Sequence, residues 1–386
     1  MKRVAIFTHA LWTNGATKSL IELLKRIDLE KCEIDLYVLD FSNPTEWVDE
    51  IPKQIHIKAV PRYNFSKETI KDIFSHPILF LKALYSGIML NGNLTEVQYM
   101  KYTAARLPFL REKYDIAISY RHFDIDVFYV NNNINASSKY FFIHGVQKLT
   151  QEEIRELKNV YIRYDAIFPV SIAAKENIVE QIPEIQAQCR VAYCVVEPNE
   201  IVRRSQQGVK FNTKGNVWKI FTIGRLSQEK GIKLVVEACK LLKMAGYNIE
   251  WRVAGEGPQR EMLEQLIKSE KLENEFLLLG NIANPYGLLS TCDIYVQPSL
   301  MESYGLTINE AKIFNKPIVC TDISAAREQI INNQTGLLVS ANAKSIADAV
   351  CRYIDNPVFR ENIYNNLSKE DKSHYESVII FNSLLE

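Results

Sequence analysis

The 386-residue chain lacks a net charge, because 46 lysines and arginines are balanced by 46 aspartates and glutamates. Its pI is near 7, so it has no basic surface on the scale of the whole protein, and we expect no nucleic-acid partner. It also lacks any C-x-x-C pair. The seven cysteines, an odd number, therefore indicate neither a disulfide framework nor a zinc site, and they favour reduced thiols in a cytoplasmic protein.

A long hydrophobic run is missing as well. The longest apolar stretch, PILFLKALYSGIML at residues 77–90, is shorter than the roughly 20 residues that span a bilayer, and Lys82 interrupts it. The N-terminal MKRVAIFTHA enters a strand-like segment without the apolar core of a signal peptide. We therefore expect a cytoplasmic protein that does not cross a membrane.

The same stretch leaves contact with a membrane surface open. Residues 62–113 contain eight lysines and arginines against four acidic residues, an excess that could bind an anionic inner leaflet. An ordinary buried helix with a solvated face explains the pattern too. Peripheral binding to the cytoplasmic face of a membrane is thus one of two interpretations of residues 77–90.

Short β-rich runs that alternate with helix-period segments fill nearly the whole chain. Most of the runs are apolar without interruption, as is typical of strands whose sheet is covered on both faces. Strands are predicted at residues 3–9, 33–40, 55–60, 115–120, 139–144, 166–171 and 190–196, and again at 218–226, 250–257, 276–281, 293–299, 317–322 and 336–340. Helices are predicted at residues 230–245 and 258–271, among others. The pattern indicates an α/β protein in which a parallel sheet with crossover helices is built twice.

A polar stretch, EPNEIVRRSQQGVKFNTKGN, separates the two halves, and one proline and two glycines interrupt it. We predict an N-terminal Rossmann-like domain at residues 1–200, a linker at 201–216 and a C-terminal Rossmann-like domain at 217–360. Because doubly wound sheets bind ligands outside the carboxyl ends of their strands, two facing domains would form a ligand-binding cleft between them.

Two turns in the second half carry glycines and charges. In TIGRLSQEKG, Gly224 allows a tight turn, and Arg225 and Lys230 stand on either side of an expected helix start. Two cations beside a helix N-terminus suit a diphosphate, although an exposed turn with solvated charges is the alternative. The turn VAGEGP contains Gly255 but lacks the third glycine of a dinucleotide fingerprint, because Arg260 stands in its place. Alone, it indicates only a strand-to-helix turn.

The stretch SLMESYGLTINEAK carries two carboxylates around one glycine. If a helix begins near Gly305, the amides around it are free to bind a phosphate. Glu302 then lies in the loop before the helix, and Glu310 lies one to two turns inside it, leaning back toward the N-terminus. Acceptors on both sides of a phosphate site match a nucleotide sugar, with its ribose, diphosphate and sugar. Alternatively, Glu302 is a surface residue and Glu310 bonds a neighbouring helix.

Taken together, these motifs resemble glycosyltransferase family four. The E-x7-E pair in ESYGLTINE, with GRLSQEKG, AGEGP and CDIYVQPS in the expected order, carries the resemblance, and TNGATKSLIELL and FIHGV extend it over nearly the whole chain. The resemblance implies a GT-B fold with two Rossmann-like domains, in which residues 1–200 bind the acceptor and residues 217–360 bind the nucleotide sugar. It also implies that a final helix, in residues 361–386, crosses back to the N-terminal domain. It further implies a retaining transferase that needs no cofactor or metal and uses a nucleotide-sugar donor, in the first place a UDP-sugar. The acceptor would be a glycan or lipid-linked molecule of surface polysaccharide or lipopolysaccharide-type biosynthesis.

The resemblance also implies a role for each matching residue. Glu310 would hold the ribose hydroxyls, Glu302 the hydroxyls of the donor sugar, and His144 the transferred sugar at the reacting centre. Arg225 and Lys230 would neutralise the diphosphate, whose charge grows as its bond to the sugar breaks. The full donor-binding set is Gly15, Gly224, Arg225, Lys230, Gly255, Glu302, Ser303, Tyr304, Gly305, Leu306 and Glu310, and the catalytic set is His144, Arg225, Lys230 and Glu302.

The chain departs from the family pattern at three places. Asn14 replaces the first of two glycines, Gly145 follows His144 where many members have an acid, and Ser303-Tyr304 replaces a common Gly-Phe. These departures concern the identity of the sugar and the acceptor.

Two other signals have competing explanations. The DID motif at residues 124–126 could hold a metal, but it more simply caps the next helix. His9 follows the first strand and could line the cleft or serve the structure.

Other functions stay open at this point. The chain could be another GT-B enzyme, a glycan phosphorylase or a sugar-nucleotide epimerase, or a sugar-binding protein without enzymatic activity.

Overall fold

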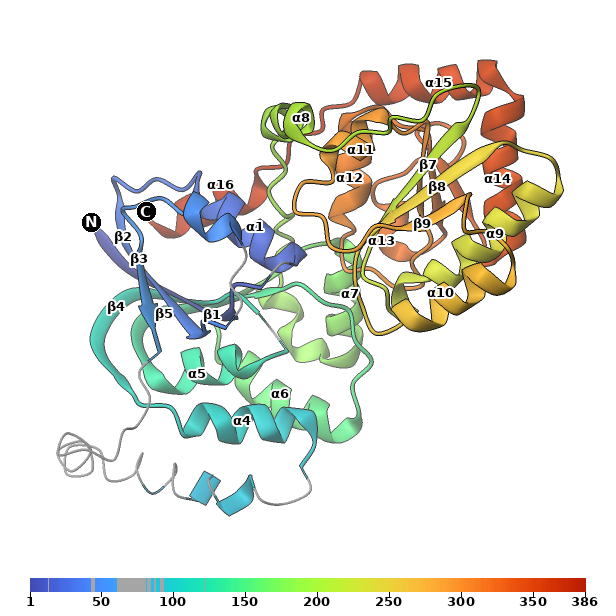
Figure 1. The fold of residues 1–386 in the computed structure, drawn as a ribbon. Coiled ribbons are helices and arrows are strands. Elements are labelled where there is room, and N and C mark those ends of the chain that lie inside the picture. Colours follow the sequence, from blue (N-terminus) through green and yellow to red (C-terminus); the bar gives the residue numbers. More distant parts are fainter. Residues whose placement is uncertain are drawn as a thin grey trace. The chain divides into compact units, whose positions relative to one another are not determined.

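The computed structural model describes residues 1–12, 14–42, 46–60, 81, 85–86, 88–90, 94–121 and 123–386. The chain forms two compact units. The N-terminal unit contains residues 1–195 and 375–386, and the C-terminal unit contains residues 196–374 (Figure 1). Each unit is described by itself below.

The N-terminal unit is built on a six-stranded parallel sheet. Its strands are β1 (Lys2–Ala10), β2 (Cys32–Asp40), β3 (His56–Ala59), β4 (Leu110–Ser119), β5 (Ile134–Ile143) and β6 (Ala166–Pro169). They lie in the order β3-β2-β1-β4-β5-β6, and every neighbouring pair is parallel. The order reverses between β1 and β4, which makes the crevice at their carboxyl ends the expected ligand site of this unit.

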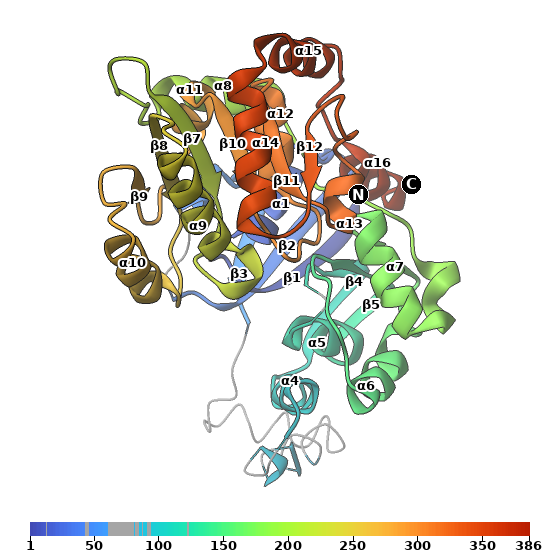
Figure 2. The ribbon, with the colours of Figure 1, turned by 90° about the vertical axis from the view of Figure 1, so that its right-hand side faces the viewer.

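Helices cover both faces of this sheet (Figure 2). The helices are α1 (Gly15–Leu24), η1 (Glu46–Glu50), α4 (Glu96–Ala105), α5 (Ile125–Asn133), α6 (Gln151–Tyr161), α7 (Ile172–Gln181), η2 (Pro183–Gln188) and α16 (Glu376–Leu384). Leu20 of α1 and Phe381 of α16 pack with Val4 and Ile6 on one face. Helices α4, α5 and α6 pack on the other face, around Phe7.

The C-terminal unit repeats this topology. Its strands are β7 (Trp218–Ile223), β8 (Ile249–Ala254), β9 (Phe276–Leu278), β10 (Ile294–Gln297), β11 (Ile318–Thr321) and β12 (Leu337–Val339), in the order β12-β11-β10-β7-β8-β9. Its helices are α8 (Pro198–Gln207), η3 (Gln228–Lys230), α9 (Ile232–Met244), α10 (Arg260–Ser269), α11 (Tyr286–Thr291), α12 (Leu306–Ile313), α13 (Ser324–Arg327), α14 (Ala343–Asp355) and α15 (Pro357–Ser368). The prediction of two doubly wound parallel sheets is therefore confirmed.

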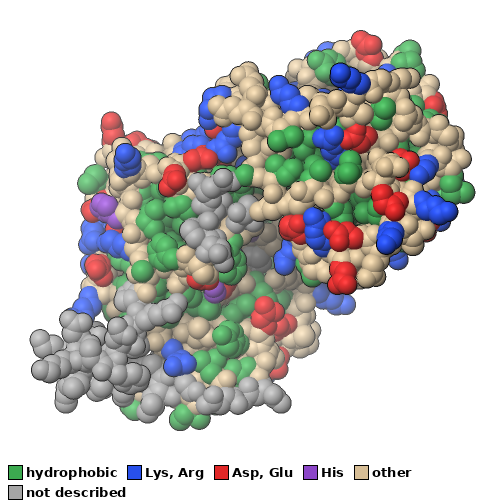
Figure 3. Space-filling view, in the orientation of Figure 1, with side chains coloured by type: hydrophobic (Ala, Val, Ile, Leu, Met, Phe, Trp, Pro, Cys, Tyr) green, Lys and Arg blue, Asp and Glu red, His purple; other side chains and the backbone are tan. Residues whose placement is uncertain are grey.

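Alternate strand residues enter two separate cores of the C-terminal unit. Ile220 and Ile294 pack with α9 and α14, whereas their neighbours Phe221 and Tyr295 pack with α11 and α12. Because both faces are buried, most positions of these strands are apolar. The face of this unit seen in Figure 3 carries lysines, arginines and acidic residues side by side, as a neutral composition predicts.

Two predicted segments differ from the structure. Residues 190–196 do not form a strand; the chain there makes only scattered bonds, such as the one from the Ala192 amide to the Pro169 carbonyl at 2.8 Å. The predicted linker at 201–216 begins inside helix α8, which belongs to the C-terminal unit. Helix α8 is amphipathic: most of its residues are polar, but Ile201 and Ser205 are buried on one side. The many polar residues are the reason that the sequence predicted a linker here.

Residues after His374 belong to the N-terminal unit, so the last crossing of the chain follows α15. In α16, the Ser377 hydroxyl donates to the Ala192 carbonyl at 3.1 Å, and the Asn382 side chain accepts from the Asp28 amide at 3.0 Å. Of the predicted segment 361–386, only this last part joins the N-terminal unit, because α15 packs on α14 of the C-terminal unit.

All seven cysteines are free thiols, as predicted. Burial raises the pKa of the Cys194 thiol to about 11 and that of Cys292 to about 12, so these thiols stay protonated at neutral pH.

Most of residues 77–90, the segment for which membrane contact is one interpretation, lies outside the described residues. Within the described part of the chain, we find no helix whose length and apolarity would let it span a membrane.

Candidate active site

The crevice of the C-terminal sheet lies at the carboxyl ends of β7 and β10, where the strand order reverses. Gly224 follows β7, and its amide donates to the Ala254 carbonyl at the end of β8 at 3.0 Å. A Cβ atom on Gly255 would lie 1.9 Å from the Gly224 carbonyl oxygen, and the φ of Gly255 is +154°. Gly255 is thus needed for the close approach of two neighbouring turns.

The predicted cations lie in the turn after β7. Lys230 ends η3, and Gly231 follows in the left-handed region with φ of 64°. A Cβ atom on Gly231 would lie 2.1 Å from the Pro298 carbonyl oxygen, so this glycine holds the start of α9 against the loop after β10. Arg225 and Lys230 both precede α9, which begins at Ile232, and do not flank its start as expected. The Arg225 side chain is exposed.

Lys230 and Glu302, which are 72 positions apart, meet at this crevice. The Lys230 Nζ lies 2.7 Å from Glu302 Oε1, and the side chains are 24% and 10% exposed. The same Oε1 accepts from Gln297 Nε2 at 3.0 Å and from the Ser299 hydroxyl at 2.8 Å. Every contact of the Glu302 carboxylate with described residues uses Oε1, which leaves Oε2 for a ligand. Glu302 is therefore held in place and is not a mobile surface residue.

A buried amide supports this carboxylate, and sequence reasoning missed it. Gln297 is the last residue of β10 and is buried. Its Oε1 accepts hydrogen bonds from the Tyr295 hydroxyl and, at 2.9 Å, from the Thr307 hydroxyl. With its oxygen so occupied, its amide nitrogen must point to Ser299 and Glu302. A glutamine inside an otherwise apolar strand, DIYVQPS, was the signal that could have revealed it.

Helix α12 begins where the sequence predicted. Gly305 precedes it in the left-handed region, with φ of 78°, and no side chain caps the first turn. The amides of Leu306 and Thr307 are thus suited to bind an anion. The Tyr304 ring, by contrast, is buried, and its hydroxyl accepts from the Asn309 side chain at 2.9 Å. Tyr304 is therefore placed to contribute through the backbone turn that leads into α12.

Glu310 lies inside α12, between one and two turns from its start, and is almost fully buried. It accepts from the Tyr286 hydroxyl of α11 at 3.1 Å, so a bond to a neighbouring helix is present.

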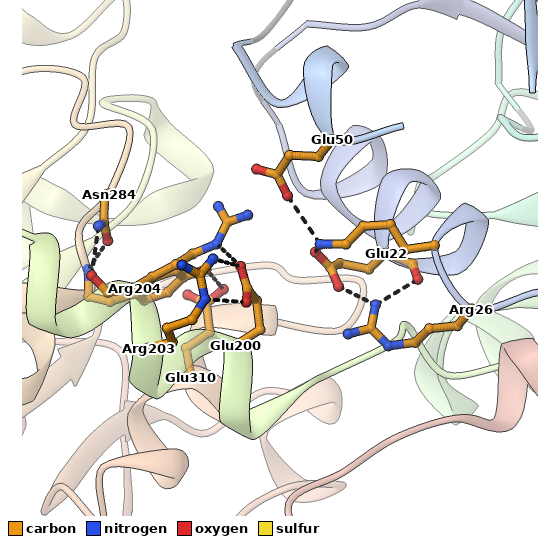
Figure 4. A network of polar contacts seen from close by, with 10 residues as sticks. Glu22, Arg26, Glu50, Glu200, Arg203, Arg204, Asn284 and Glu310 are labelled. Carbon is orange, nitrogen blue, oxygen red and sulfur yellow. Dashed lines mark hydrogen bonds and ion pairs between the residues drawn. The ribbon is translucent and has the colours of Figure 1, made fainter. Parts of the chain in front are cut away.

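Figure 4 shows Glu310 together with an ion-paired group on α8, in which Glu200 binds Arg203 at 2.7 Å and Arg204 at 2.8 Å. Hydrogen bonds from these arginines, Arg203 first, lower the pKa of Glu200 to about 2.

The remaining predicted residues belong to the N-terminal unit. Gly15 is the first residue of α1, and the Asn14 side chain caps that helix by accepting from the Thr17 amide at 2.9 Å. The departure from glycine at position 14 therefore supplies a helix cap. His144 directly follows β5, and its ring centroid lies 4.7 Å from that of Tyr120, whose hydroxyl bonds Ser19 at 3.0 Å.

One further cluster forms at the crevice between β1 and β4. The Asp124 side chain caps α5, as predicted, by accepting from the Ile125 amide at 2.7 Å. It also bonds His9 Nδ1 at 2.8 Å. Potential ligand atoms of His9, Asp124 and Asp126 lie within 4.8 Å of one another, and among the described residues these three are the group whose spacing could admit a metal ion. Metal independence remains a prediction.

Comparison with known proteins identifies the fold and the reaction class. Residues 204–370 match the family model of glycosyl transferases group 1. A Campylobacter jejuni protein, N-acetylgalactosamine-N,N'-diacetylbacillosaminyl-diphospho-undecaprenol 4-alpha-N-acetylgalactosaminyltransferase, is 26% identical over 390 residues, which cover 100% of this chain and 99% of that protein. The alpha-D-kanosaminyltransferase of Streptomyces kanamyceticus is 29% identical over 159 residues, which cover 40% of this chain and 41% of that protein.

Solved structures agree on the fold along the whole chain. Anabaena HepE in complex with UDP-glucose superposes with a TM-score of 0.70 at 18% identity and covers 100% of this chain and 98% of that one. TarM of Staphylococcus aureus superposes with a TM-score of 0.69 at 15% identity, and both chains are covered completely. At these identities, the likeness concerns the fold alone.

Proposed function

We propose that the chain is a glycosyltransferase that retains the anomeric configuration of the sugar it transfers; its residues 204–370 match the family model of glycosyl transferases group 1. The donor is a nucleotide diphosphate sugar, in the first place a UDP-sugar. The acceptor is a glycan or lipid-linked molecule of surface polysaccharide biosynthesis. The observation that carries the donor part is the Lys230–Glu302 pair beside the uncapped start of α12.

In this proposal, the diphosphate binds between Lys230, Arg225 and the first amides of α12. Lys230 can approach a phosphate while Glu302 stays bonded to Gln297 and Ser299. Glu302 Oε2 then accepts from a hydroxyl of the donor sugar, and Glu310 accepts from the ribose. The contacts that already hold both carboxylates reduce the entropy that donor binding must remove.

The reaction breaks the bond between the anomeric carbon and the diphosphate oxygen, and the electron pair leaves with the diphosphate. The acceptor oxygen bonds the same carbon, and its proton passes to the departing diphosphate. Lys230 and the helix amides stabilise the growing negative charge without having to reorganise during the step. His144, held against the Tyr120 ring, would contact the transferred sugar near the reacting carbon.

The support for the acceptor class comes from a relative. The Campylobacter jejuni protein is named for a diphospho-undecaprenol-linked acceptor, and its alignment covers the chain from end to end. An acceptor of this kind lies in a membrane, so we also propose that the chain works at the cytoplasmic face of a membrane without crossing it. Residues 77–90 would make this contact.

A thermal-shift screen tests the donor. UDP, GDP and their sugars are added in turn to the purified protein, and a ligand at 100 times its dissociation constant should add about 2.7 kcal/mol to the free energy of unfolding. A uridine ligand is expected to stabilise most. The proposal fails if no nucleotide stabilises the protein. An epimerase is distinguished by incubation with the bound UDP-sugar alone, since it would convert the sugar without needing an acceptor.

A further inference from the structure

The buried glutamine at the end of β10 uses all of its hydrogen-bonding positions. Strand β10 lies between β7 and β11 in the C-terminal sheet (Figure 2), and Gln297 is 2% exposed. Its Oε1 accepts from the Tyr295 hydroxyl and, at 2.9 Å, from the Thr307 hydroxyl. Its Nε2 donates to the Ser299 hydroxyl at 2.8 Å and to Glu302 at 3.0 Å. An amide oxygen has two lone pairs and an amide nitrogen two hydrogens, so Gln297 is fully bonded by side chains of its own unit.

The orientation of this amide is set by the charge beside it. If the amide were flipped, its carbonyl oxygen would face the Glu302 carboxylate, and two acceptors would lie against each other. The hydroxyl of Tyr295, on the opposite side of the amide, can donate, because burial raises its pKa well above the usual value. Gln297 therefore has one favourable orientation, in which its N–H groups are directed at Glu302 and Ser299. A buried network that is satisfied in this way is rigid.

The donors to Glu302 Oε1 are of two kinds. Lys230 is charged, partly exposed and located at the end of η3, whereas the Gln297 amide and the Ser299 hydroxyl are neutral and buried. In the proposed donor site, Lys230 approaches the diphosphate and gives up part of its contact with Glu302. The two buried donors then hold the carboxylate in place and leave Oε2 for the ligand.

The same network reaches the proposed diphosphate site. Thr307 is the second residue of α12, so its amide belongs to the uncapped first turn, while its hydroxyl donates to Gln297 at 2.9 Å. Ser299 is fixed from the other side, because its carbonyl accepts from the Thr321 hydroxyl of β11. Gln297 thus joins the start of α12 to Glu302, and it determines how the carboxylate is placed relative to the helix amides.

Resting on the proposed function, we infer that Gln297 is a positioning residue for the transferred sugar. It holds the Glu302 carboxylate directed at a sugar hydroxyl, at a fixed place relative to the diphosphate. Gln297 lies beneath Glu302 and does not touch the donor itself. Its contribution is therefore to the recognition of the sugar and not of the nucleotide, whereas a glutamine that only stabilised the fold would affect both alike.

Calorimetry on the full-length protein tests this separation with UDP and with UDP-N-acetylglucosamine, UDP-N-acetylgalactosamine and UDP-glucose. The UDP-sugar that the wild type binds most tightly is then used for the variants. Gln297→Met keeps the length of the side chain and removes both N–H groups. Its affinity for the UDP-sugar should fall at least about tenfold, because the charged Glu302 loses a buried donor. Its affinity for UDP should stay close to that of the wild type.

Gln181→Met is the matched control. Gln181 is a bonded glutamine of the N-terminal unit, and its Nε2 donates to the Gln147 carbonyl at 2.8 Å and to the Asn177 carbonyl at 2.9 Å. Its replacement also removes a network of hydrogen bonds, but it should leave the affinities for UDP and for the UDP-sugar unchanged.

Gln297→Glu adds a pH signature that a purely structural role would not give. A protonated carboxyl at this position donates to Glu302 as the amide does, whereas an ionised one faces a second carboxylate. Burial and the like charge raise the pKa of such a carboxyl. The affinity of Gln297→Glu for the UDP-sugar, relative to the wild type at the same pH, should therefore fall as the pH rises from about 5.5 to about 8.5. Gln297→Met should show a constant deficit over this range.

The comparison at each pH cancels the contribution of the neighbouring titratable groups, which the wild type carries too. Burial raises the pKa of the Tyr295 hydroxyl and of the Cys320 thiol, so neither titrates in this range. The other charged groups on the elements packed around Gln297 are Glu229 and Lys230 of η3, Glu302 in the loop before α12, and Glu310 of α12.

The inference is overturned if Gln297→Met binds the UDP-sugar as the wild type does, or if it loses affinity for UDP and the UDP-sugar equally. It is also overturned if Gln297→Glu binds the UDP-sugar equally well at both ends of the pH range. Because Gln297→Glu keeps the shape of the side chain, it decides the question should Gln297→Met fail to fold. A failure of the proposed function looks different, since the wild type itself would then bind neither UDP nor a UDP-sugar.

Discussion

The two sheets of the chain share one strand order but carry different chemistry at the point where that order reverses. In the C-terminal unit, the crevice holds the Lys230–Glu302 ion pair, supported by Gln297 beneath it. In the N-terminal unit, the equivalent crevice holds the His9–Asp124 pair beside an exposed tryptophan. One crevice offers positive charge and uncapped amides, whereas the other offers a neutral hydrogen-bonding surface.

This difference shows what topology determines and what it leaves to the loops. The reversal of strand order fixes where a ligand binds in each unit. The residues at the strand ends decide which ligand it is. The cations of the C-terminal crevice are the basis of the proposal that it binds the diphosphate of the donor. Each prediction below changes one crevice and asks whether the other keeps its function.

Lys230→Ala should cause the largest loss, because it removes the cation that we propose to stabilise the leaving diphosphate. Loss of one fixed group that stabilises the transition-state charge costs about 3 to 4 kcal/mol, or about 10²- to 10³-fold in kcat. Release of UDP in a coupled assay measures the effect. Lys344→Ala is the matched control, since Lys344 forms an exposed pair with Asp348 on α14. If the Lys230→Ala enzyme has a normal kcat, Lys230 does not stabilise the leaving diphosphate, and the proposed role of the C-terminal crevice is wrong.

His144→Ala tests the N-terminal unit in the same assay. A contact made mainly in the transition state should lower kcat and kcat/KM together, by at least about 10²-fold, the low end for a positioned catalytic group. Affinity for UDP should stay unchanged, because Lys230, Arg225 and Glu310, which are proposed to bind it, lie in the C-terminal unit. Circular dichroism must show an intact fold, since the ring packs on Tyr120. Normal turnover would leave His144 with a structural role only.

Glu310→Ala should weaken the donor without a comparable effect on the acceptor. A hydrogen bond to a charged group contributes about 1.5 to 3 kcal/mol, so the affinity for a nucleotide sugar should fall at least about tenfold. Calorimetry measures this affinity. Tyr286→Phe is the control, because this variant removes the hydroxyl that donates a hydrogen bond to Glu310 and keeps the Glu310 carboxylate. If both variants bind the donor like the wild type, Glu310 only joins α12 to α11.

The architecture could be predicted from the sequence because each strand and most helices have a recognisable pattern among residues that are close together in the chain. Both faces of each sheet are buried, so the strands appear as apolar runs, and the start of α12 follows from Gly305 in its left-handed conformation. Helix α8 was missed for the opposite reason. Its outward face is so polar that its sequence resembles a linker, although Ile201 and Ser205, four positions apart, lie on a buried side.

The contacts of the two crevices could not be predicted in the same way. Lys230 meets Glu302 across 72 positions, and His9 meets Asp124 across 115. No local period relates such residues; only the order of the strands brings them together. Two separate motifs of the second half nevertheless pointed to Lys230 and to Glu302, whereas His9 stood alone in the sequence and Asp124 was predicted as a helix cap or, alternatively, a metal ligand.

The smallest effect is expected from removing metal ions, and it tests whether the two crevices differ in charge as described. His9, Asp124 and Asp126 could in principle admit an ion. However, Asp124 Oδ1 already accepts from the Ile125 amide and from His9, and Arg121 lies near its second oxygen. An ion would have to displace these contacts, while in the proposed donor site Lys230 and Arg225 balance the charge of the diphosphate.

Turnover should therefore be unchanged after dialysis against EDTA, with UDP release as the measurement and Mg²⁺ or Mn²⁺ added back as the control. Asp124→Asn extends the experiment, since an amide oxygen can still cap α5 and accept from His9 but is a poorer ligand for a divalent ion. Should chelation abolish activity, with Mn²⁺ restoring it to the wild type and not to Asp124→Asn, the N-terminal crevice would be a metal site. The contrast between a charged and a neutral crevice would then have to be given up.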